Sequence, residues 1–263
     1  DKTAYEMLRS LVGSEMCIRD SCISHDCFKL HIMFLMRNST YRLERISQSD
    51  EVWPAKICAQ CKKGQRPVVV TTTHAEPWGK ASLMRIDDKM MGSLSAQKNP
   101  PRQLGVFRQR WCPYADPKGC WVALEDMRDP GNLGTIIRTA DAAGAAGIIL
   151  VGQSCDPWGP DCVRATMGSI FGVPMVRLTS PDFLDLCRAW PGESIGTHLK
   201  ATESFRRNYL QPILLVMGSE GKGLSDEAAA ACTTLVRNPM RDGAESLNVA
   251  IATGLMLYEA LKP

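Results

Sequence analysis

The chain has 263 residues, 44% of them hydrophobic, and a formal net charge of +3, so it can bury a real core in one large domain or two of ordinary size. No apolar run reaches the roughly 18 residues of a membrane-spanning helix, which excludes a helical membrane protein and favours a soluble one. Eleven cysteines without a regular spacing favour reduced thiols, and hence the cytoplasm or an organelle matrix, over a disulfide framework.

The first 24 residues look foreign to the rest of the chain. The stretch SLVGSEMCIRDS, residues 10–21, resembles a translated sequencing adapter. Glu15, Arg19 and Asp20 interrupt any apolar core that a secretory signal would need. We therefore expect residues 1–24 to be non-native and give them no part in the fold.

Residues 25–111 are expected to form a small α/β substrate-binding domain, because short apolar runs such as PVVVTTT and QLGVF lie among basic and turn residues. Residues 1–120 hold 19 Lys and Arg against 12 Asp and Glu, whereas residues 121–263 hold 12 against 16. A basic first half indicates either an anionic partner or a solvated basic face.

The spacing of two cysteines raises the question of a zinc site. Cys58 and Cys61 have the spacing of half a zinc site, but Cys112 and Cys120, the only candidates for the other half, are wrongly spaced. Ordinary thiols are the better interpretation, and no metal is expected.

Residues 112–119, CPYADPKG, have the composition of a linker, and the pattern changes after them. Segments with the pattern of strands then alternate with segments of helical periodicity. Ser180 and Ser225 are expected to cap two of these helices. Strands that are apolar throughout, alternating with helices, predict an α/β domain over residues 120–263 with a parallel sheet covered on both faces. The expected strands are WVALED, GIILVG, VPMVRL, SIGTHL, PILLVMG and TTLVRNPM, and the expected helices are NLGTIIRTADAAGA, DCVRATMGSI, SPDFLDLCRAW, LSDEAAAAC and SLNVAIATGLMLYEALK.

In such sheets ligands bind beyond the carboxyl ends of the strands, which directs attention to the loops after Asp126, Met217 and Asn238. The second loop lies in LVMGSEGKGLSDE, residues 214–226. Its spacing fits neither a phosphate loop nor a dinucleotide fingerprint. A turn followed by a helix start accounts for much of it, but not for Glu220 between glycines.

The first and third loops each carry polar residues with two interpretations. Asn132 is either a helix cap or a functional side chain, and so is Ser246, which precedes Asn248 at the start of the last helix. Arg138 lies among apolar residues of its helix, where an unpaired arginine is costly. His198, alone in its strand, is expected to be structural.

Together, NLGTIIRTADAAG, VMGSEGKGLS and NPMRDGAESLNVAIATG resemble the three signature motifs of the SpoU/TrmH family of RNA ribose methyltransferases, in the family's order. The similarity extends over residues 121–261. It implies an α/β fold whose carboxyl-terminal segment is threaded into a deep trefoil knot, a homodimer packed through the knotted domain, and S-adenosyl-L-methionine as cofactor.

The resemblance also implies site residues. Arg138 has the central role, either as a base or, since a guanidinium has a pKa above about 12, as the group that positions an RNA phosphate. Glu220 would orient Arg138, within one chain or across the dimer. Asn238 departs from the aliphatic residue common at its position. The implied catalytic residues are Asn132, Arg138, Glu220, Ser246 and Asn248, and the implied cofactor-binding residues are Thr197, Gly218, Glu220, Gly223, Asn238, Met240, Ser246 and Leu247.

The activity implied is methyl transfer to a ribose 2′-hydroxyl of structured RNA. The expected substrate is ribosomal RNA, ahead of transfer RNA, because of the accessory domain. A protein of this fold that binds RNA without catalysis, and a methyltransferase acting on a base nitrogen, are the alternatives.

Overall fold

The computed structural model describes residues 109–241 and 246–262 and, before them, Lys89 and four strands. The chain divides into two compact units, Asp1–Gln109 and Arg110–Pro263. The segment expected to be non-native, residues 1–24, and the pair Cys58 and Cys61 lie outside the described residues. The roles assigned to the domains stay predictions.

The strands of the first unit form one four-stranded sheet in the order β1-β4-β2-β3. Strand β4 is antiparallel to both β1 and β2, and β2 is parallel to β3. Two of these strands, β2 and β4, lie in the apolar runs PVVVTTT and QLGVF, whereas no strand was predicted at β1. The strands are β1 (Leu30–Phe34), β2 (Val69–Thr72), β3 (Ser82–Arg85) and β4 (Gln103–Arg108).

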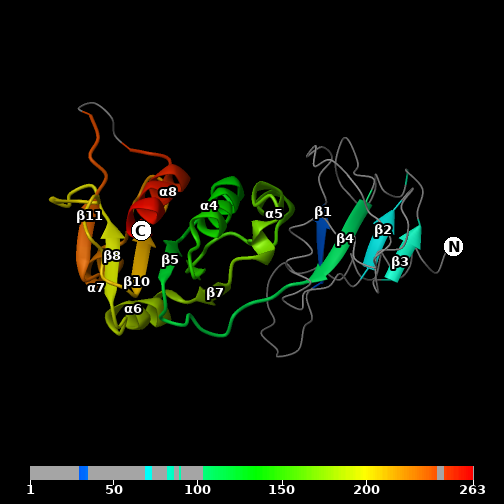
Figure 1. Ribbon diagram of the computed structural model, residues 1–263, viewed down its shortest axis with the longest axis horizontal. Helices are drawn as coiled ribbons and strands as arrows, with labels where there is room; N and C mark the ends of the chain where they lie inside the picture. The colour runs from blue at the N-terminus through cyan, green and yellow to red at the C-terminus, as the bar shows by residue number, and fades with distance from the viewer. Residues whose placement is uncertain are drawn as a thin grey trace. The chain divides into compact units, whose positions relative to one another are not determined.

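The second unit is built on a seven-stranded sheet in the order β7-β6-β5-β10-β8-β11-β9, and every pairing in it is parallel. This confirms the α/β class (Figure 1). The two-residue β9 was not predicted, because it is too short to show a periodicity. The strands are β5 (Cys120–Glu125), β6 (Gly147–Val151), β7 (Met175–Leu178), β8 (Glu193–Thr197), β9 (Glu203–Ser204), β10 (Ile213–Met217) and β11 (Thr234–Arg237).

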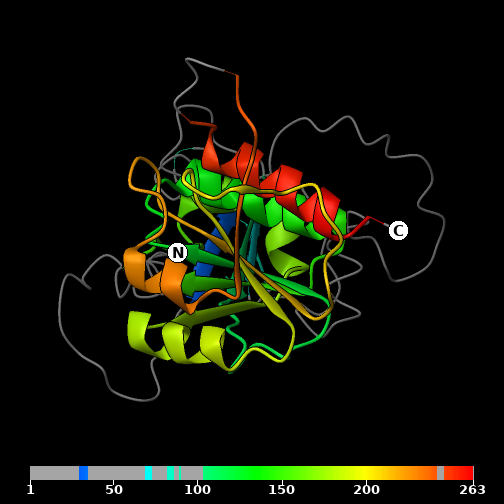
Figure 2. The same ribbon diagram turned by 90° about the vertical axis from the view of Figure 1, so that its left-hand side faces the viewer.

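Helices cover both faces of this sheet, as predicted. Figure 2 shows α4 and α8 on one face and α6 and α7 on the other. Alternate residues of each strand point to opposite faces, so Trp121 and Ala123 of β5 pack with Phe183 of α6, while Val122 and Leu124 face the other layer. No helix in the described part of the chain is both long and apolar enough to cross a membrane. The helices are α4 (Pro130–Ala143), α5 (Pro160–Ala165), α6 (Ser180–Arg188), α7 (Asp226–Ala231) and α8 (Val249–Ala260), with a 3₁₀ turn at Ser169–Phe171.

Predicted helix boundaries differ in the structure at α5 and α6. The helix expected over residues 161–170 ends at Ala165, because Met167 has φ of 51° and Gly168 has φ of 89°, which no right-handed helix allows. The cap of α6 is Thr179 rather than Ser180, since the Thr179 side chain accepts the Asp182 amide at 3.3 Å. Ser225 caps α7 as predicted, with its Oγ 3.1 Å from the Ala228 amide.

The segment with the composition of a linker packs against the second unit. The Cys112 amide donates to the carbonyl of Met175 at 2.7 Å, which extends the pairing beyond the edge strand β7. The Trp121 indole donates to the carbonyl of Asp116 at 2.7 Å. Ala115, between them, is buried. The segment is therefore attached to the sheet at both of its ends.

Candidate active site

The loops singled out in the sequence meet at one edge of the sheet. Strands β5, β10, β8 and β11 are neighbours and run parallel, so their carboxyl ends lie together. Leu124 of β5 is paired with Met217 of β10, and the two loops leave the sheet side by side.

The loop after β10 folds back on itself as a short hairpin. Ser219 and Gly223 exchange two backbone hydrogen bonds of 3.1 and 3.0 Å. Gly221 and Gly223 have φ of 83° and 71°, which favour glycine. A Cβ at Gly218 would lie 2.0 Å from the Gly223 carbonyl carbon, so only glycine fits there. The hairpin therefore presents Glu220 and Lys222 at its exposed tip.

A chain of side-chain hydrogen bonds joins the three loops. The Asn132 Nδ2 donates to Glu220 Oε1, and the Asn248 Nδ2 donates to Asn132 Oδ1 at 3.0 Å. Asn248 Oδ1 in turn accepts the amides of Ala250 and Ile251 at 2.9 and 3.2 Å, which caps α8. Three residues predicted for the site are thus brought into one connected group.

The two alternative cap interpretations are wrong. The cap of α4 is Asp129, whose Oδ1 accepts the Asn132 amide at 2.6 Å, so the Asn132 side chain is left for Glu220. The cap of α8 is Asn248, and Ser246 is exposed without a side-chain hydrogen bond to any described residue. Both helices begin two or three residues away from where a capping residue was expected.

Arg138 is exposed, so the expectation that it lies in apolar surroundings is wrong. The buried face of α4 is formed by Leu133, Ile136, Ile137 and Ala140, and residue 138 is turned away from it. Within the part of the chain that the structure describes, Arg138 makes no ion pair or hydrogen bond. Glu220 therefore does not orient it within one chain, and the guanidinium is available to an external anion.

The residues predicted to hold a cofactor lie at the carboxyl ends of β8, β10 and β11 and just before α8. Thr197 ends β8, and its Oγ1 lies 3.7 Å from the sulfur of Met217. Asn238 follows β11, and its Oδ1 is buried without a hydrogen-bond donor among the described residues. A buried acceptor left unpaired costs about 1–3 kcal/mol, so a ligand with an N–H or O–H group is favoured here. Met240 is half-buried and Leu247 is exposed.

His198 Nδ1 accepts the Lys200 amide at 3.2 Å within a turn, and its structural role stays a prediction. In the described ranges, no three His, Cys, Asp or Glu side chains converge as metal ligands.

The sequence-based interpretation missed one further residue, Glu125. Glu125 is the last residue of β5. Its carboxylate accepts two hydrogen bonds from Ser225, one from the backbone amide at 2.8 Å and one from the hydroxyl at 2.6 Å. The only signal was an acidic residue that closes an otherwise apolar strand. The partner lies 100 residues away, beyond the reach of any local pattern.

The SpoU rRNA Methylase family matches residues 119–258, which include all three loops. The chain belongs to this family. A relative from Synechocystis, an uncharacterized tRNA/rRNA methyltransferase, is 41% identical over 179 residues, which cover 66% of this chain and 65% of the relative. The 23S rRNA (guanosine-2′-O-)-methyltransferase RlmB of Pseudomonas syringae is 30% identical over 200 residues, 74% of this chain and 69% of that protein.

Among solved structures, this SpoU family chain is similar to an AdoMet-bound rRNA methyltransferase from Sinorhizobium meliloti. The TM-score is 0.72 at 37% identity, over 79% of this chain and 84% of the other. The chain spans about half to two thirds of the length of the curated relatives that match first.

Proposed function

We propose that the protein transfers a methyl group from S-adenosyl-L-methionine to a ribose 2′-hydroxyl of structured RNA, with ribosomal RNA ahead of transfer RNA. The observation that carries the proposal is the hydrogen-bonded group of Asn132, Glu220 and Asn248, which links the three family loops. The helix α4 that supplies Asn132 also carries the exposed Arg138. Relatives described as acting on 23S rRNA and as an AdoMet-bound rRNA methyltransferase support it.

The residues present suit this cofactor. The hairpin glycines would let the backbone approach it closely, and the unpaired Asn238 Oδ1 can accept a hydrogen bond from an amino or hydroxyl group of the adenosine part. Thr197, Met240 and Leu247 would complete the pocket. When bound, the cofactor supplies a methyl group that its sulfonium already activates.

The chain's own residues would then position the acceptor. Arg138, free of protein anions, would bind an RNA phosphate and stabilise the alkoxide that develops at the 2′-oxygen. A guanidinium is a very weak base once protonated, so we assign the proton to the phosphate or to a water rather than to Arg138. Asn132 would hold Glu220 at the reacting edge, and Asn248 fixes which way the Asn132 amide points.

The direct test is transfer of tritiated methyl groups to total RNA, followed by nucleoside mass spectrometry. The expected product is a 2′-O-methylated nucleoside, whereas a base-methylated product would favour the alternative chemistry. Calorimetry should show binding of S-adenosylmethionine and S-adenosylhomocysteine without added metal. A folded sample that binds neither compound contradicts the proposal. RNA binding without transfer would identify the protein as a non-catalytic RNA-binding member.

RNA recognition is proposed to depend on the first unit, whose basic character motivates this assignment. Removing residues 1–109 is expected to weaken RNA binding and to leave cofactor binding unchanged. Binding by the whole chain is expected to fall steeply with salt, because phosphate contacts release counterions. If the shortened chain bound RNA equally well in filter binding, recognition would belong to the second unit.

Cytoplasmic location is part of the proposal, since the substrate RNA is there.

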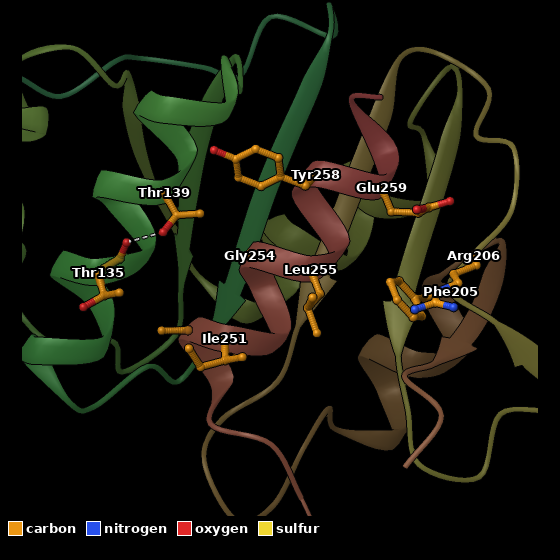
Figure 3. Close-up of a pocket in the computed structure, with 10 residues that line it drawn as sticks. Thr135, Thr139, Phe205, Arg206, Ile251, Gly254, Leu255, Tyr258 and Glu259 are labelled. Atoms are coloured by element: carbon orange, nitrogen blue, oxygen red, sulfur yellow. Dashed lines mark hydrogen bonds between the residues drawn. The ribbon is translucent and has the colours of Figure 1, made fainter. Parts of the chain in front are cut away.

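A homodimer through α8 is also proposed. Leu247, Ile251, Leu255 and Tyr258 form an exposed apolar stripe, with exposed fractions of 42%, 56%, 44% and 61%. Three of these side chains, Ile251, Leu255 and Tyr258, line an open groove of about 470 Å³, which α4 borders on one side of α8 and Phe205 and Arg206 on the other (Figure 3). An apolar face of this kind on a soluble protein is typical of an interface.

The trefoil knot belongs to the same proposal. Its support is the return of α8 from the far end of the sheet to pack on α4 and β10. A knotted chain pulled from its two ends should reach a contour length shorter than the roughly 3.3–3.6 Å per residue of an open chain. Full extension in an optical-tweezers experiment would show that the chain is not knotted.

A further inference from the structure

Glu125 connects two loops that are far apart in the sequence. It is half-buried at the end of β5. One of its carboxylate oxygens accepts a hydrogen bond from the Ser225 amide at 2.8 Å, and the other accepts one from the Ser225 hydroxyl at 2.6 Å. The same hydroxyl accepts the Ala228 amide at 3.1 Å to cap α7. Hydrogen bonds to a carboxylate are stronger than neutral ones, so this contact fixes the start of α7 against β5.

The glycine hairpin is held from outside at two points. At its tip, Glu220 accepts a hydrogen bond from Asn132, and just beyond its base Ser225 is held by Glu125. Both holding residues flank the same connection, from β5 to α4. Between these points the hairpin relies on its own Ser219–Gly223 bridge and on buried Leu224. Three glycines give such a segment high conformational freedom, so the outer contacts decide where Glu220 lies.

We propose that Glu125 is a positioning residue of the active site, which fixes the glycine hairpin through Ser225. It touches no reacting atom, and the inference rests on the proposed function. A carboxylate suits this role because both of its oxygens are acceptors, whereas a glutamine offers only one and turns an NH₂ group toward a donor. Glu125→Gln therefore breaks one of the two hydrogen bonds with little change in volume.

Trypsin provides a test that does not depend on activity. Lys222 lies exposed at the hairpin tip, and Lys118 lies exposed at the opposite end of β5, so one digest of the full-length protein reports on both places. Glu125→Gln is expected to raise cleavage after Lys222 about tenfold relative to cleavage after Lys118, the scale for losing one hydrogen bond to a charged group. An unchanged ratio would overturn the inference.

The matched control is Asp126→Asn. Asp126 is the neighbouring acid, but its Oδ1 accepts the Gln153 amide at 2.8 Å on the other side of β5. It has φ of 49°, a conformation that asparagine tolerates. This variant should leave cleavage after Lys222 unchanged. An equal increase in cleavage after Lys222 in both variants would show that removing either acid at the end of β5 loosens the hairpin. That result would contradict a specific role for Glu125.

The second arm measures methyl transfer. Glu125→Gln is expected to raise the KM for S-adenosylmethionine about tenfold, and its effect on kcat should shrink when Glu220 is already replaced in Glu220→Gln. The effects of the same two substitutions on the free energy of unfolding should be additive. If Glu125 only stabilised the fold, the two effects on kcat would be additive as well. Additive effects on kcat would contradict the inference.

Ser225 variants keep the test usable if Glu125→Gln does not fold. Ser225→Ala removes the hydroxyl bond and should reproduce both effects, whereas Ser225→Thr retains the hydroxyl and should restore wild-type behaviour. If the wild type transferred no methyl group but the digest responded, the proposed function would fail while the role of Glu125 in holding the hairpin stood. If the wild type were active and neither the digest nor KM changed, the inference alone would fail.

Discussion

Arg138 and Asn132 lie on the same helix and differ in how far their polar groups are already engaged. Asn132 is hydrogen-bonded through both ends of its amide, to Glu220 and to Asn248. Arg138 is exposed and makes no ion pair within the described residues. A side chain that is hydrogen-bonded at both its oxygen and its nitrogen can position its neighbours, whereas an unpaired guanidinium can bind a phosphate.

Arg138→Ala should therefore separate activity from stability. Because the side chain is exposed, the free energy of unfolding should change by no more than about 0.5 kcal/mol. Methyl transfer should fall roughly a hundredfold, the scale for losing an electrostatic contact in the transition state. Arg138→Lys should not restore it, since lysine lacks the planar fork. Single-turnover assays at saturating RNA measure the effect, and a near-normal rate would show that Arg138 takes no part in catalysis.

Asn248 has two roles that substitution can divide. Asn248→Asp keeps the acceptor for the Ala250 and Ile251 amides and places a favourable charge at the start of α8. It loses the donor to Asn132 Oδ1. We expect unchanged thermal stability with methyl transfer lowered about tenfold. Asn248→Ala should also lose about 1 kcal/mol of stability with the cap. Full activity of Asn248→Asp would make the bond to Asn132 dispensable.

At the scale of elements, the glycine hairpin is a segment in which side chains would be poorly tolerated at two positions. Its backbone crosses itself at Gly218, where a Cβ would meet Leu224 N at 2.1 Å. At Gly221 nothing lies within 4 Å of such a Cβ, so the only obstacle there is a φ of 83°. The two glycines thus test steric contact and backbone conformation separately.

Gly218→Ala is expected to force the hairpin open. It should lower the free energy of unfolding by about 1–3 kcal/mol and abolish cofactor binding in calorimetry. Gly221→Ala should cost about 1 kcal/mol, the penalty for a side chain in the left-handed region, and retain measurable binding. Binding by Gly218→Ala equal to that of the wild type would show that the hairpin does not contact the cofactor.

At the scale of the whole molecule, α8 is apolar on both sides. Its inner face buries Val249, Met256 and Leu257, and its outer face exposes Ile251 and Leu255. A helix that is apolar all round is normally covered all round, which favours a second copy of this chain on the outer face.

Leu255→Lys is the test of that interface. A charge in the middle of the stripe should convert a dimer to a monomer in sedimentation equilibrium, because an unpaired ammonium is costly to bury. Leu210→Lys, at a leucine 68% exposed and outside the stripe, should leave the dimer intact. A wild-type protein that is monomeric at tens of micromolar would contradict the proposal before either variant is made.

The sequence by itself determined the α/β class, the parallel sheet and the three loops that matter. Apolar runs such as PILLVMG and their alternation with helices are local patterns, and local patterns survive in the folded chain. Tertiary structure alone decided that Asp129 and Asn248 cap the helices, that Arg138 faces solvent, and that Glu125 holds Ser225. The hydrogen bonds of the site span 88, 100 and 116 residues. Such partners are set by the strand order, which places β10 beside β5, and no periodicity along the chain encodes that order.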